Sequence, residues 1–321
     1  MVDFLNPADW VFVWLQTLLF VLLAPLFSGW IKWLKCLLQN RRPPSLLQPY
    51  RDLLRLVRKD VLLADNASVL FRGAPYIICG CTVLAASVVP LLVLHQPISA
   101  MADVIVLVGL FALARFFLAL AGMDVGTAFG GMGSSREMTV SALAEPAMLM
   151  VVFTLSMVAS STNLSTLVEH GLQQQSVLRP SILFALIALI MVAIAENARI
   201  PVDNPATHLE LTMIHEAMIL EYSGRHLAMM ELASQLKLTT YAVLIIDLFF
   251  PWGIAQSASA AGLGMAVVAI AVKLSLLGLL LALGETAVAK MRLFKAPTFL
   301  AMSFALAMIG MLSFVILESS K

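Results

Sequence analysis

Charge is scarce in this sequence. Only 12% of the 321 residues are Asp, Glu, Lys or Arg, whereas 61% are hydrophobic. A soluble domain carries about 25% charged residues, and the mean hydropathy here is +0.95. The composition therefore predicts an integral membrane protein that contacts lipid. With a net charge of only +1, no nucleic-acid partner is expected.

Cysteine is equally scarce, and several cofactor patterns are missing. The three thiols, Cys36, Cys79 and Cys81, lack the Cys-x-x-Cys spacing of metal or iron–sulfur ligands. His215 begins a zinc-protease HExxH pattern, but Ile219 occupies the place of the second histidine. No directly bound metal or cofactor is therefore predicted. The GTAFGGMG segment (126–133) lacks the Gly-Lys-Ser/Thr of a phosphate loop, and we expect it to be an unwound inner loop.

Long apolar runs dominate the rest of the chain. Crossing the hydrocarbon core takes about 20 helical residues. Eight runs reach this length, near residues 10–31, 70–94, 101–122, 138–160, 181–200, 238–255, 260–283 and 298–317. The first follows Asp3 and Asp9 and has no cleavage site, so we expect it to be retained rather than removed as a signal peptide. The predicted fold class is all-α: one polytopic domain over 1–321 with about eight transmembrane helices.

Basic residues indicate the orientation. Sixteen of the twenty Lys and Arg residues fall in the connections after spans 1, 3, 5 and 7 or at the adjoining span ends. The positive-inside rule then places the N-terminus outside and these connections in the cytoplasm. The corresponding inner segments, predicted to dock partners, are residues 36–65, 123–137 and 201–237.

Two inner segments combine charge with apolar residues. Residues 40–60 form a proline-rich turn followed by a basic amphipathic helix, which fits either anionic lipid headgroups or a soluble partner. The second segment begins with Glu196. Its Asn204-Pro205 pair predicts a helix start and Gly224 a stop, so Glu210 and Glu221 would share one face.

Several charges fall inside the predicted spans. Counting from the inner ends, Arg115, Glu145, Glu196 and Lys273 share a layer roughly 6–15 Å deep. Asp247 is predicted at mid-bilayer and Glu285 at the inner end of the seventh span. Such groups should pair with one another or line a wet cavity. Static ion pairs are one interpretation. Because carboxylates in a low dielectric hold protons more tightly, we favour a proton relay.

The motifs carry a family resemblance. Glu196-Asn-Ala-Arg199-Ile-Pro-Val-Asp203, followed by Glu221-Tyr222-Ser-Gly224, resembles the ETNRxPFD and EYSG signatures of respiratory complex I membrane subunit 1, the H-type subunit. The likeness is greater to the homologous subunit of group 4 nickel–iron hydrogenases, of the formate hydrogenlyase and hydrogenase-4 types. Their RRGP, EYRD, ARFF, GLDTG, SRE and EP elements are matched in order from Arg41 to Glu145.

The sequence also departs from the family pattern. Pro43 replaces the glycine of RRGP, and the inner loop keeps Glu210 alone of three glutamates, although Glu216 is added. Complex I uses this loop around its quinone cavity, so quinone binding is doubtful.

The resemblance implies a membrane anchor and coupling subunit of a hydrogenase or formate hydrogenlyase complex, without catalysis of its own, in a bacterial or archaeal cytoplasmic membrane. Implied partners are hydrogenase large and small subunits, an iron–sulfur subunit and antiporter-like membrane subunits; the nickel–iron centre and iron–sulfur clusters would lie in those partners. Two alternatives remain open, a quinone-binding subunit of an NADH or ferredoxin:quinone oxidoreductase and a stand-alone ion carrier. The predicted relay residues are Arg115, Glu145, Glu196, Asp203, Glu210, Glu216, Glu221, Lys273 and Glu285. The predicted docking residues are Arg41, Arg42, Arg51, Arg199 and Tyr222.

Overall fold

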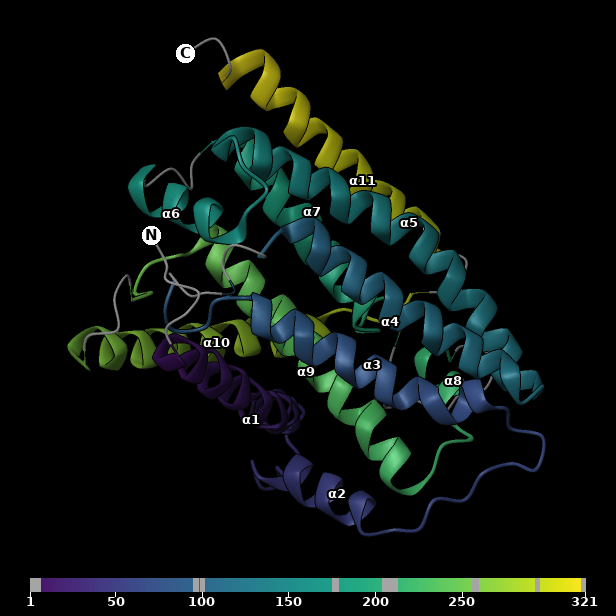
Figure 1. Ribbon diagram of the computed structural model, residues 1–321. Helices are drawn as coiled ribbons and strands as arrows, with labels where there is room; N and C mark the ends of the chain where they lie inside the picture. Colours follow the sequence, from purple (N-terminus) through teal and green to yellow (C-terminus); the bar gives the residue numbers. More distant parts are fainter. Residues whose placement is uncertain are drawn as a thin grey trace.

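The computed structural model describes residues 7–94, 98, 102–174, 179–203, 213–255, 260–291 and 295–318. This part of the chain is all-helical, with two isolated β-bridges and no strand (Figure 1). The helices are α1 (Pro7–Leu38), α2 (Gln48–Val57), α3 (Val69–Val88), α4 (Val104–Asp124), α5 (Ala128–Ala159), α6 (Leu164–Gln174), α7 (Pro180–Glu196), α8 (His215–Ile219), α9 (Gly224–Phe249), α10 (Ala260–Ala287) and α11 (Ala296–Ser313). A π-helical turn, Phe314–Glu318, continues α11.

The polytopic membrane architecture is confirmed. Within the described residues, seven helices are long and apolar enough to cross a bilayer: α1, α3, α4, α5, α9, α10 and α11. The eighth predicted span is α7, an apolar helix of only 17 residues. At 1.5 Å per residue it is about 26 Å long, and its direction changes at Ala198, which has a positive φ of 48°.

Helix α9 is the central element. It contacts α1, α2, α3, α6, α7 and α10, and 78% of its apolar window is buried inside the protein, against 22% for α10 and for α11. Figure 1 shows α9 between α3 on one side and α1 with α10 on the other. The apolar faces that α10 and α11 leave uncovered are therefore available to lipid or to neighbouring subunits.

The prediction of an unwound loop at 126–133 is wrong, because α5 begins at Ala128. Its glycines serve close helix packing within the chain. A Cβ on Gly130 would lie 2.1 Å from the carbonyl oxygen of Gly122 in α4, and a Cβ on Gly133 would lie 2.9 Å from the Cβ of Ala217 in α8. The glycines thus allow a close approach of α4 and α8 to α5 within the chain.

The prediction of one continuous helix over 204–224 is also wrong for residues 213–224, the part of this range that the structure describes. Helix α8 covers only His215–Ile219, a turn follows, and Gly224 begins α9 instead of ending a helix. Gly224 has a φ of +53°, and a Cβ there would lie 2.5 Å from the carbonyl oxygen of Asp60. The chain must therefore turn sharply where the segment after α2 approaches, and Glu221 lies outside any helix. Glu210 lies outside the described residues.

Candidate functional site

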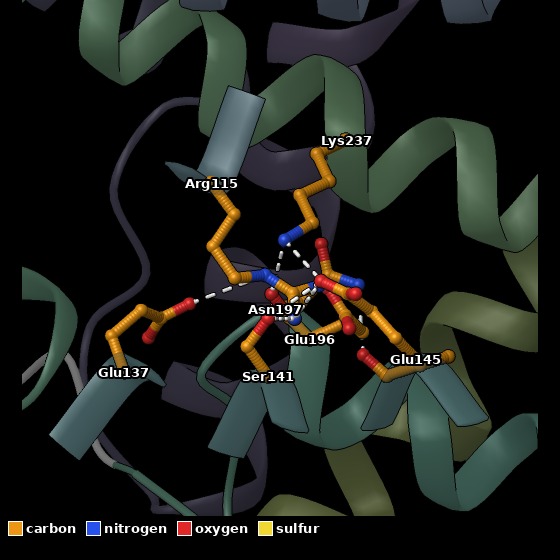
Figure 2. A network of polar contacts seen from close by, with 8 residues as sticks. Arg115, Glu137, Ser141, Glu145, Glu196, Asn197 and Lys237 are labelled. Carbon is orange, nitrogen blue, oxygen red and sulfur yellow. Dashed lines mark hydrogen bonds and ion pairs between the residues drawn. The ribbon is translucent and has the colours of Figure 1, made fainter. Parts of the chain in front are cut away.

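Arg115 of α4 lies at the centre of a buried polar network, drawn in Figure 2. The residue is 4% exposed, and its guanidinium contacts three carboxylates. One terminal nitrogen donates to Oε2 of Glu196, Nε lies 3.5 Å from Glu137, and the other terminal nitrogen lies 3.6 Å from Glu145. Because a guanidinium carries five donors in a rigid plane, one side chain can hold together acids from separate helices.

Helix α5 supplies three members of the network at intervals of four residues. Glu137, Ser141 and Glu145 therefore lie on one face of α5. The Ser141 hydroxyl accepts a hydrogen bond of 2.7 Å from Arg115 and donates one of 2.6 Å to Glu145. Ser141 thus links Arg115 to Glu145 through a chain of two hydrogen bonds, along which a proton can move.

Glu196 is the last residue of α7, where the helix dipole disfavours a negative charge. Two cations compensate for this position. Besides Arg115, Lys237 of α9 places Nζ 2.9 Å from the Glu196 carboxylate and donates a 2.7 Å hydrogen bond to the backbone carbonyl of the same residue. The Glu196 side chain is only 2% exposed, so both ion pairs are largely shielded from water.

The network does not balance its own charge. Glu137, Glu145 and Glu196 are acidic and Arg115 and Lys237 are basic, so one negative charge remains if every group is ionised. Glu145 is the member nearest the outside of the chain, with a side chain 37% exposed. The arrangement therefore keeps an exposed carboxylate at the edge of a set in which the acids outnumber the bases.

A small cavity of about 50 Å³ adjoins the network. Its wall includes Arg115, Glu137, Glu196, Lys237 and His215 of α8. A cavity of this size has room for a few water molecules. His215 therefore shares one cavity with Glu137 and Glu196.

A second group of ion pairs lies at the C-terminal ends of α1, α7 and α10. Glu285 of α10 contacts Lys35 of α1 at 2.6 Å and Arg199 at 3.4 Å. Asp203, 2% exposed, contacts Lys290 at 2.7 Å and accepts a 3.2 Å hydrogen bond from the backbone of Ile214. These contacts attach the segment after α7 to α1, α10 and α8.

A larger cavity of about 320 Å³ lies between α1, α7, α9 and α10. Its wall is mostly aliphatic, and its polar end carries Asn197, Arg199 and Glu285. Asn197 also lines the small cavity beside Glu196. The turn after α7 therefore separates an apolar space from the charged network. Arg41 lines neither of these two cavities.

The prediction that Lys273 shares the layer of Arg115 is wrong. Its Nζ donates to the backbone carbonyls of Phe250, at 2.6 Å, and of Trp252, beyond the far end of α9. The reason is helix length, because α10 extends to Ala287 and Lys273 lies near its middle. Asp247 lies near the end of α9, which ends at Phe249.

The predicted docking residues divide into two groups. Arg41, Arg42 and Arg51 are exposed around the start of α2. Arg199 is paired with Glu285. Tyr222 is buried at 4% exposure, where its ring stacks on Phe71 at 4.0 Å and its hydroxyl donates a 2.9 Å hydrogen bond to the Phe71 carbonyl.

Tyr222 therefore attaches the turn between α8 and α9 to α3. Burial, and secondarily the charge of Asp124, raises the pKa of the Tyr222 phenol above its usual range, so the hydroxyl remains a donor. Glu221 is exposed beside it and Glu216 is half-buried on α8.

Three members of the network were not predicted as site residues: Glu137, Ser141 and Lys237. The spacing of 137, 141 and 145 was a usable signal, because it places three polar side chains on one face of any helix that starts before residue 137. It was missed because the span was predicted to begin at residue 138. Lys237 was missed for a similar reason: the sixth span was predicted to begin at residue 238, which left Lys237 at the end of the preceding loop.

Comparison with known proteins adds family information to this geometry. Residues 11–316 match the NADH dehydrogenase family. Formate hydrogenlyase subunit 4 of Escherichia coli K12 is 32% identical over 93% of this chain and 96% of its own length. Hydrogenase-4 component C of the same organism is 31% identical over 88% of each chain.

The similarity extends to a quinone oxidoreductase and to a solved respiratory complex. NADH-quinone oxidoreductase subunit 8 of Rhodothermus marinus is 27% identical over 65% of this chain and 61% of its own length. A chain of the membrane-bound sulfane sulfur reductase, an archaeal respiratory membrane complex, superposes with a TM-score of 0.76 at 19% identity, covering 94% of this chain and 98% of that chain. That structure shares the fold.

Proposed function

Because this chain belongs to the NADH dehydrogenase family and is homologous to formate hydrogenlyase subunit 4, we propose that it anchors the soluble arm of a complex I-like membrane hydrogenase and couples that arm's redox chemistry to proton movement. It is a membrane subunit of a complex I-like hydrogenase or a related respiratory complex. The relay, the identity of the arm and the direction of coupling are the proposal.

The observation that carries the proposal is the network around Arg115. Four helices, α4, α5, α7 and α9, contribute ionisable side chains to it. Buried ion pairs are poor stabilisers compared with apolar packing, so stability alone is a weak reason to gather five such groups in the network around Arg115. A set with one uncompensated negative charge is instead suited to accept and release a proton.

Coupling requires that the docked arm alter the charge balance of this set. Glu196 is joined directly to the inner segment 197–203, which Arg199 and Asp203 attach to α10 and the residues beyond it. A displacement of this segment moves the end of α7, and with it the Glu196 carboxylate between Arg115 and Lys237. Such a movement biases which carboxylate holds the proton.

Glu145 is the proposed exit toward neighbouring membrane subunits. It lies in a membrane-spanning helix, yet its side chain is 37% exposed on the isolated chain. A carboxylate facing lipid is costly, so we propose that a partner of antiporter-like type covers it. On the inner side, exposed Arg41, Arg42 and Arg51 offer positive charge to the soluble arm.

The proposal places the redox cofactors in the partners. Electrons would pass through a hydrogenase large and small subunit and an iron–sulfur subunit, and this chain would respond to their charge.

The nickel and iron content of the complex that co-purifies with a tagged copy of the chain in mild detergent tests the identity of the arm. We expect nickel together with abundant iron. Iron without nickel, with bound quinone, would overturn the hydrogenase assignment in favour of a quinone reductase. Neither metal, together with ion transport by the purified chain alone, would support a stand-alone carrier.

A further inference from the structure

Asp247 is a buried carboxyl without a hydrogen-bond partner. Its exposed fraction is 0%, and neither of its carboxylate oxygens has a hydrogen-bond donor within the described part of the chain. It lies in a run of apolar residues near the end of α9. A buried carboxylate without donors is costly, so such a group either carries a proton or depends on a cation nearby.

Lys273 of α10 is that cation. Its ammonium binds the carbonyl of Phe250, three residues after Asp247, and it is the only charged residue of α10 before Glu285. Its ammonium is held by the carbonyls of Phe250 and Trp252, just beyond the end of α9. Helix C-termini leave carbonyls unsatisfied and carry partial negative charge, so these two carbonyls are available to bind the ammonium.

The loop that carries these carbonyls is fixed in place. A Cβ on Gly253 would lie 2.5 Å from the Cβ of Ala269, one turn before Lys273 on α10. Ala255 exchanges hydrogen bonds with the backbone of Leu92 and Leu94, at 2.9 and 3.1 Å. The carbonyls therefore form a preorganised binding site for the ammonium. Lys273 is partly buried, and Trp252 beside it is 54% exposed, so this binding site reaches the protein surface.

This pair is separate from the network around Arg115. Asp247 follows Lys237 by ten residues on α9, which is about 15 Å along the helix axis. The hydroxyls of Thr239 and Thr240, between them, donate to carbonyls of the same helix. The pair also lies at the opposite end of α9 from α2, since α9 begins at Gly224 beside Asp60.

We propose that Asp247 and Lys273 form a second proton-binding site, which exchanges protons with the aqueous phase at the end of the membrane domain opposite α2. The ionised pair is a carboxylate beside an ammonium. A proton arriving from the side of Trp252 binds a carboxylate oxygen and gives a neutral carboxyl beside the ammonium; its departure by the same side restores the ionised pair.

Among the described residues, other titratable groups at this end include Asp103 at the start of α4, which accepts a 2.8 Å hydrogen bond from Thr162. Glu169 and His170 lie on α6, which packs against α9; they are next to Gly171, whose added Cβ would lie 3.2 Å from the Cγ of Pro251. Nε2 of His170 is buried and has no hydrogen-bond partner among the described residues. Any pH dependence of the site therefore has to be separated from the titration of His170, for which a His170→Gln variant serves.

Carbodiimide labelling tests the site directly. Dicyclohexylcarbodiimide adds to protonated carboxyl groups in apolar surroundings, and mass spectrometry of the peptide that contains residue 247 reads the product. The protein would be labelled as the intact complex in native membranes at acidic, neutral and alkaline pH. We expect labelling of Asp247 that falls as pH rises, is lost in Asp247→Asn, and is retained in His170→Gln.

Replacing the lysine sharpens the test. Lys273→Met removes the compensating charge, so the carboxyl should stay protonated and labelling should rise several-fold at neutral and alkaline pH; Lys273→Arg should resemble the unaltered chain. Lys295→Met, the same change at an exposed lysine at the start of α11, should leave labelling at residue 247 unchanged.

Absence of labelling at every pH in both the unaltered chain and Lys273→Met would overturn the proposal and identify the pair as a static tie between α9 and α10. The unaltered chain gives an answer even if a variant fails to assemble. Because labelling is read without any redox assay, its result is independent of the hydrogenase assignment.

Discussion

The ammonium of Lys237 contacts two oxygen atoms of Glu196. It lies 2.9 Å from the carboxylate and donates a 2.7 Å hydrogen bond to the backbone carbonyl of the same residue. The second contact matters as much as the first. It occupies a carbonyl at the end of α7, which lacks a partner within its own helix. One lysine thereby fixes both the charge and the position of the acid next to the inner segment.

Replacing Lys237 with Met should therefore destabilise the chain. Breaking a buried ion pair leaves an uncompensated charge and costs about 3 kcal/mol or more; Arg115 still contacts Glu196, which keeps the loss near the lower value. The midpoint of thermal unfolding, followed by size-exclusion chromatography of detergent-solubilised complex, measures it. Lys237→Arg keeps the charge and should lose less. An unchanged midpoint in Lys237→Met would mean that the contact contributes nothing to stability.

Neutralising the buried acids should separate coupling from assembly. Glu196→Gln and Glu145→Gln keep side-chain size and one oxygen acceptor but remove the proton-binding group. We expect both variants to assemble with their partners and to retain redox activity, while proton movement in inverted membrane vesicles is largely lost. The control is Thr139→Ala, an exposed position on the same helix as Glu145, whose hydroxyl bonds to its own helix backbone. Full proton movement in both glutamine variants would refute the relay.

Reversing charge at the start of α2 should release the soluble arm. Arg41 and Arg42 are exposed, so Arg41→Glu with Arg42→Glu leaves the fold of the chain intact and repels an acidic partner surface. Pull-down of the tagged chain should recover the membrane partners with little of the hydrogenase subunits. Lys295→Glu, an exposed basic residue at the start of α11, is the matched control and should keep the arm. Equal recovery of the arm from both variants would count against docking at this loop.

The membrane-spanning helices were predictable because hydrophobic length is a local property of the sequence. The apolar runs located every long helix and the short α7, and the family motifs identified Arg115, Glu145 and Glu196. Helix ends were less predictable, because α5 and α9 continue well past the apolar boundary into polar sequence that tertiary contacts support. Glu137 and Lys237 lie in those extensions.

The short helix α8 illustrates the opposite failure. The Asn204-Pro205 start and the Gly224 stop are sound local signals, yet α8 has only five residues. Its buried residues Ala217 and Met218 pack against Gly133 and Gly122. Tertiary packing against α4 and α5 therefore decided the helix length, which no local signal contains. Lys273 was misplaced for a related reason, because a long side chain near the middle of a helix can reach either boundary.

The packing of α5 against α4 gives the last prediction. Gly130 and Gly131 are neighbours in the same helical turn, but a Cβ on Gly130 would lie 2.1 Å from the backbone oxygen of Gly122, whereas one on Gly131 meets nothing within 4 Å. A backbone atom cannot move aside as a side chain can, so Gly130→Ala forces α4 and α5 apart and should cost about 1–3 kcal/mol of stability or more.

Gly131→Ala should instead be neutral or stabilising by about 0.5–1 kcal/mol, because alanine restricts the unfolded chain and favours the helix. Thermal unfolding of both variants under identical detergent conditions measures the difference. Since α5 carries Glu137, Ser141 and Glu145 toward Arg115 of α4, separation of the two helices should also reduce proton movement in Gly130→Ala and leave it normal in Gly131→Ala. Equal stability of the two variants would show that α4 and α5 do not approach as closely as the glycine contacts require.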